Sequence, residues 1–335
     1  MTALIVGGAG FIGLSIAEHL LSKGEEVVLF DRNALNGVAA EAFAALPGTY
    51  TFVQGDITQA EPIAEVIAKH QPSRIFYGAA VTSGPERELE APEMVIQVNL
   101  VGLAHTLKAA RSVEGVRLIN ISSGAAYGTG AMGETGWVGP LDEYATREEP
   151  FKIYGMTKYG SERLVRRYRE LSGMDALSVR LSTIFGPWEI DSGARDTLSA
   201  PMQAALLARS GGAATFARRD HLDWTYSRYV AGALDALIEA PRAGITSDIF
   251  NITTAKQVSV LDMCAVLKKH FPDFTYRLVE PGEEPSINLW GDKDRHPMKP
   301  DRLTVEAGHR LPNDIEATVE DFAGWIKQHG AFWGG

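Results

Sequence analysis

Two short stretches of the chain carry side chains that could move a proton. Tyr154 and Lys158, in the run YGMTK, are four residues apart, so on a helix they share one face. Tyrosine has an ordinary pKa of about 10, so a phenolate base near neutral pH needs about 4 kcal/mol of stabilisation, which a nearby ammonium can help to supply. The second stretch, NISSGAAYG, places Ser122 and Ser123 at the carboxyl end of an apolar run, where open parallel sheets present ligand sites.

The elements that must position these side chains alternate between strand and helix. Apolar runs typical of buried strands are separated by amphipathic stretches, which predicts parallel strands joined by right-handed crossovers. We therefore expect an α/β fold, a doubly wound parallel sheet of the Rossmann type, with ligand sites at the carboxyl ends of its strands. The expected strands are 3–8, 26–31, 50–56, 74–80, 116–123 and 176–182, and the expected helices are 11–24, 62–70, 92–111 and 154–171.

A glycine cluster follows the first expected strand. Gly8, Gly10 and Gly13 fit the pattern G-x-G-x-x-G between a strand and a helix. Such a turn lets backbone N–H groups approach a pyrophosphate at the helix N-terminus. Asp31 ends the next strand, where a carboxylate accepts hydrogen bonds from ribose hydroxyls and repels a 2′-phosphate. This pattern predicts a site for NAD rather than NADP, although the neighbouring Arg32 could pair with that phosphate.

The regular alternation loosens after residue 187. We expect residues 1–187 to form the NAD-binding domain, with a late strand near 248–253 returning to the sheet, and residues 188–335 to form mainly a smaller C-terminal substrate-binding lobe. The long segment 128–150 is expected to overhang the site and shape the substrate pocket. Its candidate residues are Glu134, Trp137, Asp142 and Glu143.

Composition restricts the remaining classes of function. The chain has 335 residues, a net charge of −10 and one cysteine, Cys264, which excludes an internal disulfide and a cysteine-rich zinc site. The histidines show no paired metal-ligand spacing, so no metal is expected. The acidic balance disfavours nucleic acid and anionic membranes as partners. Because the sequence contains neither a run of 18 apolar residues nor a signal-peptide pattern, we expect a cytoplasmic protein.

Together these motifs make the chain resemble the extended short-chain dehydrogenases, specifically the NAD-dependent epimerase/dehydratase family of sugar-modifying enzymes. The resemblance rests on GGAGFIG (7–13), Asp31, GDI (55–57), GAA (78–80), NLVG (99–102), SSGAAYG (122–128), YGMTK (154–158) and RLSTIFGP (180–187). It implies that Ser123, Tyr154 and Lys158 are catalytic. Tyr154 would act as the base, stabilised by Lys158 and by the positive nicotinamide ring, and Ser123 would hydrogen-bond the reacting oxygen.

The resemblance also implies roles along the cofactor groove. Asp56 and Ile57 would approach the adenine, Ala79 and Ala80 would line the groove, and Asn99 would hold nearby backbone. The full set expected to bind NAD is Gly7, Gly10, Phe11, Ile12, Gly13, Asp31, Arg32, Asp56, Ile57, Ala79, Ala80, Asn99, Ser122, Tyr154 and Lys158.

The substrate side departs from the family's pattern in two places. The run GAA follows Ser123 where the family's 4,6-dehydratases carry acidic residues, so that elimination is not expected. Leu222 stands where nucleotide-sugar members often have an arginine, and Arg219 or Arg228 could substitute for it. Trp188 and Trp224 could pack in a core or stack on a sugar. The expected substrate contacts are Thr82, Ser123, Thr183, Arg219, Trp224 and Arg228.

The resulting prediction is an NAD-dependent sugar epimerase, acting on a nucleotide sugar by transient hydride transfer. The alternatives are an NAD-dependent dehydrogenase of a free sugar, sugar acid or polyol and, more remotely, a non-catalytic NAD-binding protein. The partner is a small-molecule sugar or sugar-derived substrate.

A homodimer is also predicted, because the family usually pairs through the helices near 100–111 and 154–171 in a four-helix contact. Both expected helices carry apolar residues on more than one face. These residues are Leu100, Leu103, Leu107, Met156, Tyr159 and Leu164.

Overall fold

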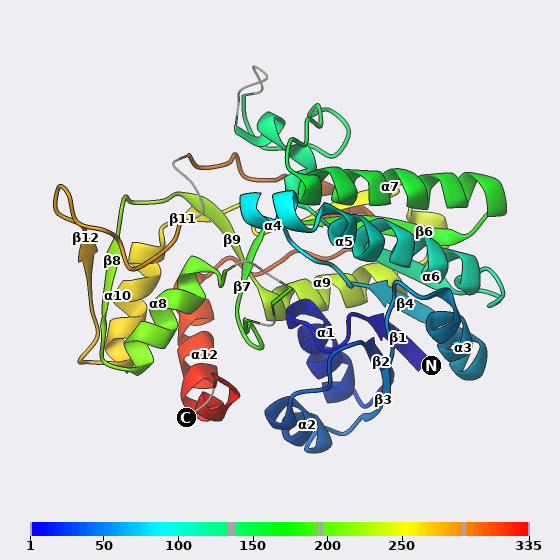
Figure 1. Cartoon of the computed structure of the whole chain (residues 1–335), viewed down its shortest axis with the longest axis horizontal. Helices are drawn as coiled ribbons and strands as arrows, with labels where there is room; N and C mark the ends of the chain where they lie inside the picture. The colour runs from blue at the N-terminus through cyan, green and yellow to red at the C-terminus, as the bar shows by residue number, and fades with distance from the viewer. Residues whose placement is uncertain (1, 133–137, 192, 195–196, 290–292, 334–335) are drawn as a thin grey trace.

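A sheet of seven strands, all parallel, forms the centre of the molecule, in the order β10-β6-β5-β4-β1-β2-β3 (Figure 1). The strands are β1 (Thr2–Val6), β2 (Glu26–Asp31), β3 (Thr49–Gln54), β4 (Arg74–Tyr77), β5 (Arg117–Ser123), β6 (Asp175–Leu181) and β10 (Ile249–Ile252). The structure, a computed structural model, describes residues 2–132, 138–191, 193–194, 197–289 and 293–333. It confirms the predicted doubly wound α/β fold. The strand order reverses between β1 and β4: β2 and β3 are added on one side of β1, and β4, β5, β6 and β10 on the other. Such a switch point is where open parallel sheets bind ligands.

Helices cover both faces of this sheet. They are α1 (Phe11–Ser22), α2 (Gly37–Ala44), α3 (Ala60–His70), α4 (Pro85–Glu90), α5 (Pro92–Ile96), α6 (Gly102–Ala110), α7 (Ile153–Ser172) and α9 (Ser227–Glu239). Alternate strand residues face opposite sides, so that in β1 Ala3 and Ile5 join one core and Leu4 and Val6 join the other. The first core includes residues of α1 and α9, and the second includes residues of α3, α6 and α7. Burial on both faces explains why these strands read as continuous apolar runs.

The helix predicted over 92–111 is interrupted in the structure. A π-helical turn, Gln97–Val101, separates α5 from α6. A π turn inserts an extra residue into the helical repeat and re-aims the side chains around it. Asn99 lies in this turn, with only 2% of its surface exposed, and its carboxamide bonds to the backbone of Val81, which follows β4. The interruption therefore places the polar side chain of Asn99 against the loop that follows the carboxyl end of β4.

The remaining elements form a lobe beside the carboxyl ends of the strands (Figure 1). A three-stranded sheet has the order β11-β9-β7, and β12 pairs with β8. The strands are β7 (Thr183–Phe185), β8 (Ala213–Phe216), β9 (Leu222–Tyr226), β11 (Gln257–Val258) and β12 (Thr275–Leu278), and the helices are α8 (Ala200–Arg209), α10 (Val260–His270) and α12 (Ile315–Gln328). Helix α11 (Asp301–Ala307) instead packs against β10 and α9 beside the seven-stranded sheet. Short 3₁₀ turns lie at Gly124–Tyr127, Thr129–Met132, Arg242–Gly244 and Gly330–Trp333.

Trp188 packs at the junction between the sheet and the lobe. Its side chain is fully buried, and its ring meets those of Phe43, Trp325 and Phe332 edge-on at 5.6, 5.0 and 5.4 Å between centroids. Trp188 is thus a core residue and not a platform for a sugar. The division of the chain at residue 187 stays a prediction.

Candidate active site

The glycine turn between β1 and α1 has a shape that requires residues without a Cβ. Gly7 has a φ of +85°, and a Cβ there would lie 2.6 Å from the backbone nitrogen of Ala79. A Cβ on Gly13 would lie 2.1 Å from the carbonyl oxygen of Gly7. Helix α1 begins after Gly10, which provides no side-chain cap for its N-terminal N–H groups. This turn fits the pyrophosphate of NAD, which such a helix N-terminus binds.

Asp31 lies beside this turn at the end of β2. Its Oδ2 accepts the N–H of Ala9 at 3.1 Å, and its Oδ1 accepts the N–H of Asn33 at 2.9 Å. Burial raises the pKa of Asp31, while the two backbone N–H groups act in the opposite direction. The side chain of Arg32 is exposed. A carboxylate fixed next to the glycine turn fits the ribose hydroxyls of NAD.

The other residues expected at the cofactor groove flank the same strand ends. Oδ1 of Asp56 accepts both the N–H and the hydroxyl of Thr58 at 2.9 Å, and Ile57 is buried in the second core. Asn99 accepts the N–H of Val81 at 2.8 Å and donates to its carbonyl at 3.0 Å. Phe11 and Ile12 open α1 and pack against the first core, Ala79 adjoins Gly7, and Ala80 is partly exposed.

The candidate catalytic side chains come from the start of α7 and from the end of β5, and α7 packs on β5 and on the 3₁₀ turn that follows it. Helix α7 begins at Ile153, whose N–H donates to Oε1 of Glu88 at 2.7 Å. One turn later, the Nζ of Lys158 lies 5.7 Å from the centre of the Tyr154 ring. Lys158 is buried, which lowers its pKa to about 8. Ser123 ends β5, and its Oγ accepts the N–H of Ala125 at 3.1 Å.

A buried ion pair between Arg180 and Glu162 lies next to Ser122 and Lys158. Arg180 in β6 donates to both carboxylate oxygens of Glu162 at 2.9 and 2.7 Å, and its guanidinium lies 4.3 Å from the centre of the Tyr127 ring. Ser122 donates to Oε1 of Glu162 at 2.7 Å. The hydroxyl of Ser122, predicted to contact NAD, is therefore directed to the carboxylate on α7. Glu162 also acts on Lys158, whose pKa it raises against the effect of burial.

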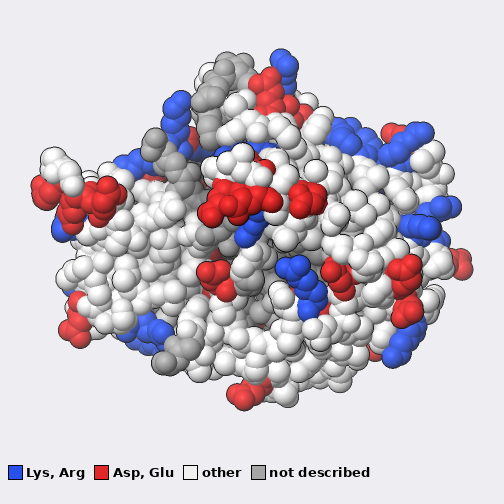
Figure 2. All heavy atoms as spheres, in the orientation of Figure 1, with Lys and Arg blue, Asp and Glu red and all other residues white. Residues whose placement is uncertain are grey.

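Gly124, the residue after Ser123, lines a pocket of about 290 Å³, a volume that includes its open mouth. The start of α7 packs on the same 3₁₀ turn, where a Cβ on Gly155 would lie 2.6 Å from the carbonyl oxygen of Ala125. The face drawn in Figure 2 is hollowed below the acidic side chains over α4. The pocket is lined by Gly124, Leu141, Ser182, Thr183, Leu222, Asp223, Arg295, His296 and Met298.

Among the expected substrate contacts, Thr183 lines this pocket, and Ser123 directly precedes the lining residue Gly124. Arg219 is half exposed and pairs with Asp262 on α10, and Arg228 lies between α1 and α12, paired with Glu18 at 3.0 Å and with Asp321 at 2.8 Å. Neither arginine lines the pocket, so the idea that one of them replaces the family's arginine beside Leu222 finds no support in the structure.

Trp224 and Thr82 also lie away from the pocket. The indole N–H of Trp224 donates to Oδ2 of Asp220 at 3.0 Å, and its buried ring packs against Phe185. Thr82 donates to the carbonyl oxygen of Ala194 through its backbone N–H at 2.9 Å. The indole of Trp224 is held by a residue four positions earlier and by Phe185, whereas the partner of Thr82 lies more than a hundred residues along the chain.

The segment 128–150 contributes Leu141 to the pocket. Asp142 and Glu143, in contrast, bind the segment to the rest of the chain. The Nζ of Lys299 lies 3.4 Å from Oδ2 of Asp142. Glu143 is buried and accepts hydrogen bonds from the N–H of Asn251 at 2.8 Å and from Arg302 at 3.2 Å. Glu134 and Trp137 lie outside the described residues. In the described part of the chain, no cluster of three or more His, Cys, Asp or Glu could hold a metal, and no helix is long and apolar enough to cross a membrane.

Sequence reasoning missed Arg295 and Asp223. Asp223 follows Leu222 in β9, and Arg295 comes from a charged stretch without periodicity near the end of the chain. No local pattern marks either residue, because the pocket is assembled only when β9 and the chain before Met298 reach the end of β5.

A parallel Rossmann sheet with a dinucleotide turn and a Ser–Tyr–Lys group defines the class, an extended short-chain dehydrogenase-type enzyme. More narrowly, the chain belongs to the NAD-dependent epimerase/dehydratase family, whose model matches residues 3–253. NAD is therefore its cofactor, in agreement with the glycine turn and Asp31.

Curated relatives include enzymes of two activities. The chain is 28% identical over 283 residues to the dTDP-glucose 4,6-dehydratase of Xanthomonas campestris pv. campestris (strain B100), a match covering 81% of this chain and 77% of that protein. It is 28% identical over 265 residues to the UDP-glucose 4-epimerase of Mycolicibacterium smegmatis, covering 78% of this chain and 80% of that protein.

Solved structures share the whole fold. The UDP-glucose 4-epimerase from Thermotoga maritima, solved with UDP-glucose, matches with a TM-score of 0.78 and 20% identity, covering 98% of this chain and 99% of that one. The dTDP-glucose 4,6-dehydratase from Bacillus anthracis, in complex with NAD, matches with a TM-score of 0.77 and 17% identity, covering 99% and 98%.

Proposed function

We propose that this chain interconverts sugar epimers by transient oxidation of a hydroxyl-bearing carbon. One arrangement supports the proposal: Lys158 on α7, whose Nζ lies 5.7 Å from the centre of the Tyr154 ring, donates to the carbonyl oxygen of Ile121 in β5. This strand ends in Ser123, and the next residue, Gly124, lines a pocket. A base, a cation and a hydroxyl at the mouth of a small pocket, next to a dinucleotide turn, suit the removal of a proton and a hydride from an alcohol.

In the proposed reaction, Tyr154 as phenolate takes the proton of the substrate hydroxyl while Ser123 hydrogen-bonds the same oxygen. When bound, NAD supplies the acceptor for the hydride that leaves the carbon and the donor that returns it. The Lys158 ammonium stabilises the phenolate, since an opposite charge favours the ionised form of a neighbouring group. Tyr154 returns its proton to the oxygen at the end, so the product differs from the substrate only in the configuration at that carbon.

The 3₁₀ turn after Ser123 supports epimerisation over dehydration. Loss of water needs an acid that protonates the leaving hydroxyl. The turn continues with Gly124, Ala125 and Ala126, which carry no proton donor on their side chains. The proposal therefore follows the epimerases among the relatives.

The test uses NAD-loaded protein and a panel of nucleotide sugars, free sugars and sugar acids deuterated at candidate carbons. We expect one substrate to give an epimer that keeps its deuterium, without accumulation of NADH. Accumulating NADH would instead indicate the dehydrogenase, and the absence of both an epimer and NADH across the panel would contradict an enzymatic role.

Replacing the base tests the assignment of residues in the same assay. Tyr154→Phe should keep NAD binding and lower turnover by roughly 10²–10⁴-fold, the typical effect of losing a general base. The matched control is Tyr159→Phe on the same helix, because the Tyr159 ring contacts Arg163 instead. Turnover near that of the wild type in Tyr154→Phe would refute the assignment.

We also propose a cytoplasmic homodimer that pairs through the face formed by α5, the π turn and α7. Leu103 and Leu107, predicted to face a partner, are buried in the chain's own core, and Leu100 packs against Gly160 of α7. The exposed apolar side chains on this face are instead Met94, Ile96, Val101 and Met156, between 39% and 48% exposed.

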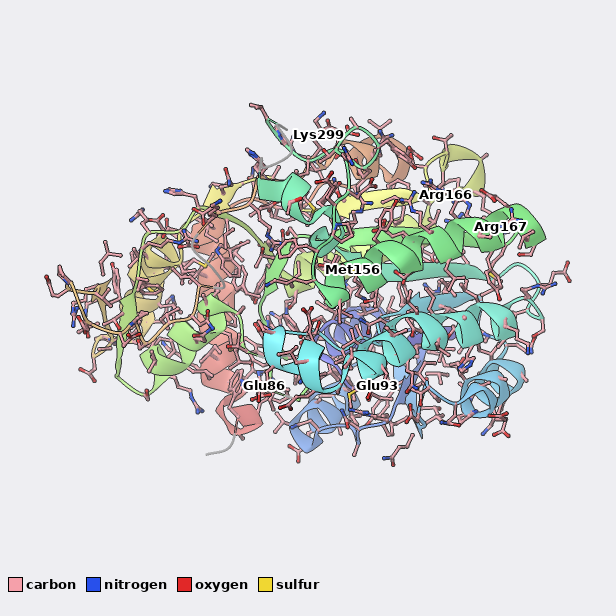
Figure 3. All side chains as sticks on the ribbon, turned by 45° about the horizontal axis from the view of Figure 1, so that its top comes forward. Glu86, Glu93, Met156, Arg166, Arg167 and Lys299 are labelled. Carbon is pink, nitrogen blue, oxygen red and sulfur yellow. The ribbon has the colours of Figure 1, made fainter. Side chains whose placement is uncertain are left out.

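Charge on the same face supports a two-fold arrangement. Figure 3 shows Glu86 and Glu93 toward one end of this face, Arg166 and Arg167 toward the other, and Met156 between them. A two-fold axis near Met156 would bring the acidic end of one protomer toward the two arginines of its partner, which within their own chain pair with Asp248 (Arg166) and Glu170 (Arg167). Such self-complementarity is what an isologous contact requires.

A further inference from the structure

Arg295 is the cation of the candidate substrate pocket. Its Nη2 donates to the hydroxyl of Thr183 at 3.0 Å, and it forms no ion pair with any residue that the structure describes. The neighbouring arginines are neutralised differently: Arg218 pairs with Asp294 at 2.7 Å, and Arg219 pairs with Asp262. A guanidinium presents five N–H donors, so that of Arg295 has donors to spare for a ligand.

Asp223 supplies the opposite kind of group in the same pocket. It is 6% exposed; its Oδ2 accepts from Thr253 and from the N–H of Met298, the latter at 3.2 Å. Its Oδ1 is buried, and nothing in the described chain donates a hydrogen bond to it. A buried acceptor without a donor costs free energy, which a ligand hydroxyl would recover.

The site lies close to the reacting group. Gly124, which follows Ser123, lines the same pocket as Arg295, and a Cβ on Gly124 would lie 3.9 Å from Nη1 of Arg295. Burial lowers the pKa of Arg295, whereas the charges of Asp223 and Tyr154 raise it. Leu141, Leu222 and Met298 provide apolar wall.

We propose that Arg295, together with Thr183, binds a carboxylate on the sugar itself, and that Asp223 accepts a hydrogen bond from a hydroxyl of the same ring. The substrate is accordingly a sugar acid. This inference rests on the proposed function, because it places the acid on the same sugar whose hydroxyl proton Tyr154 removes.

The charges in the pocket match a carboxylate better than a diphosphate. A carboxylate carries one negative charge and accepts the parallel N–H bonds of a guanidinium. A nucleotide diphosphate carries at least two charges, whereas the pocket offers one unpaired guanidinium and also holds the Asp223 carboxylate. Leu222 can offer no charge-assisted contact.

Binding by calorimetry to the NAD-loaded protein tests the proposal with matched pairs of probes. D-Glucuronate is compared with D-glucose, D-galacturonate with D-galactose, and UDP-glucuronate with UDP-glucose. Acid and neutral members of a pair differ in the carboxylate alone, so their affinity ratio isolates that contact. We expect the acid to bind about 10- to 100-fold more tightly in at least one pair, as for hydrogen bonds to a charged group.

Variants identify the residue responsible. Arg295→Met should remove the preference for the acid, while Arg219→Met, which removes a charge outside the pocket, should keep it. If thermal unfolding shows that Arg295→Met does not fold, Thr183→Val replaces it and should lower the preference. Equal affinities in all three pairs, or a preference that survives in Arg295→Met, would overturn the proposal, as would tighter binding of UDP-glucose that depends on Arg219.

A preference in the glucuronate or galacturonate pair would identify a free sugar acid as the ligand, and a preference in the UDP-glucuronate pair would identify a nucleotide-linked one. Either result supports the carboxylate contact. Failure of this inference is distinguishable from failure of the proposed function. Selective binding without epimer or NADH would leave the Arg295 site intact and refute the reaction, whereas epimerisation without any acid preference would do the reverse.

Discussion

The Nζ of Lys158 donates a hydrogen bond of 2.7 Å to the carbonyl oxygen of Ile121 in β5. This contact fastens the second turn of α7 to the strand that ends in Ser123. Lys158 is fully enclosed there, so its ammonium is fixed between the strand and the Tyr154 ring. A charge held in this way requires no reorganisation when a phenolate forms.

Activity should fall as pH rises through about 8, because that is the pKa to which burial lowers Lys158. A neutral amine no longer stabilises the Tyr154 phenolate. We therefore expect kcat/KM of the free enzyme to decrease about ten-fold per pH unit above this value.

Stability should respond to the same titration with the opposite sign. Between pH 8 and the ordinary value of 10.5, the folded protein has released the Lys158 proton and the unfolded chain still holds it, so the free energy of unfolding rises with pH. Lys158→Met should remove this rise in urea titrations across that window. Lys152→Met, which alters an exposed lysine nearby, should keep it, and an unchanged slope in Lys158→Met would contradict the assignment.

Asp31 should decide the preference for NAD. Asp31→Asn keeps the size of the side chain and removes the charge that ribose hydroxyls contact, so NAD binding should weaken by about 1.5–3 kcal/mol, and the disadvantage of NADP should shrink. Calorimetry with both cofactors measures the change. Lys69→Met is the control and should leave NAD affinity unchanged, since Lys69 is exposed in the last turn of α3. Tighter binding of NADP than of NAD by the unaltered protein would show that Arg32 decides.

Gly13 should tolerate no side chain. The Cβ of Gly13→Ala would meet the Gly7 carbonyl at 2.1 Å, and backbone must move to relieve it. We expect a loss of about 1–3 kcal/mol of stability and weakened NAD binding. Gly324→Ala in α12, where no atom lies within 4 Å of the added Cβ, should instead gain about 0.5–1 kcal/mol. Equal unfolding free energies for the two variants would contradict this reading of the turn.

Local sequence patterns were sufficient for the sheet and for the glycine turn. Six of the seven strands bury residues on both faces, so their apolar runs are continuous, whereas the edge strand β3 has no fully buried residue. The spacing from Gly13 to Asp31 is that of one helix and one strand. The shared face of Tyr154 and Lys158 follows from helical geometry alone. Such features depend on neighbours within about thirty residues along the chain, which a single sequence displays.

The pocket depends on contacts that the sequence does not display. Arg219 and Arg228 are both near Leu222 in sequence. In the structure, however, Arg219 forms an ion pair with a carboxylate on α10, and Arg228 forms ion pairs with carboxylates on α1 and α12. Arg295 reaches the site because the chain beside it pairs with the segment before Glu143, through the bridge between Leu141 and Met298. These partners are more than forty residues away from each arginine, so no periodicity or spacing could select the right one.

The dimer proposal leads to a prediction about one exposed methionine. Met156 is 48% exposed on α7, near the centre of the face shown in Figure 3. Under a two-fold axis, Met156→Arg would place two like charges close together in an apolar contact and cost the dimer its burial of Met94 and Val101. We expect the variant to be monomeric in light scattering at micromolar concentration, where the unaltered protein is dimeric. Val305→Arg on α11, which is 81% exposed and away from this face, should remain dimeric. A monomeric unaltered protein, or a Met156→Arg variant that stays dimeric, would count against pairing through α7.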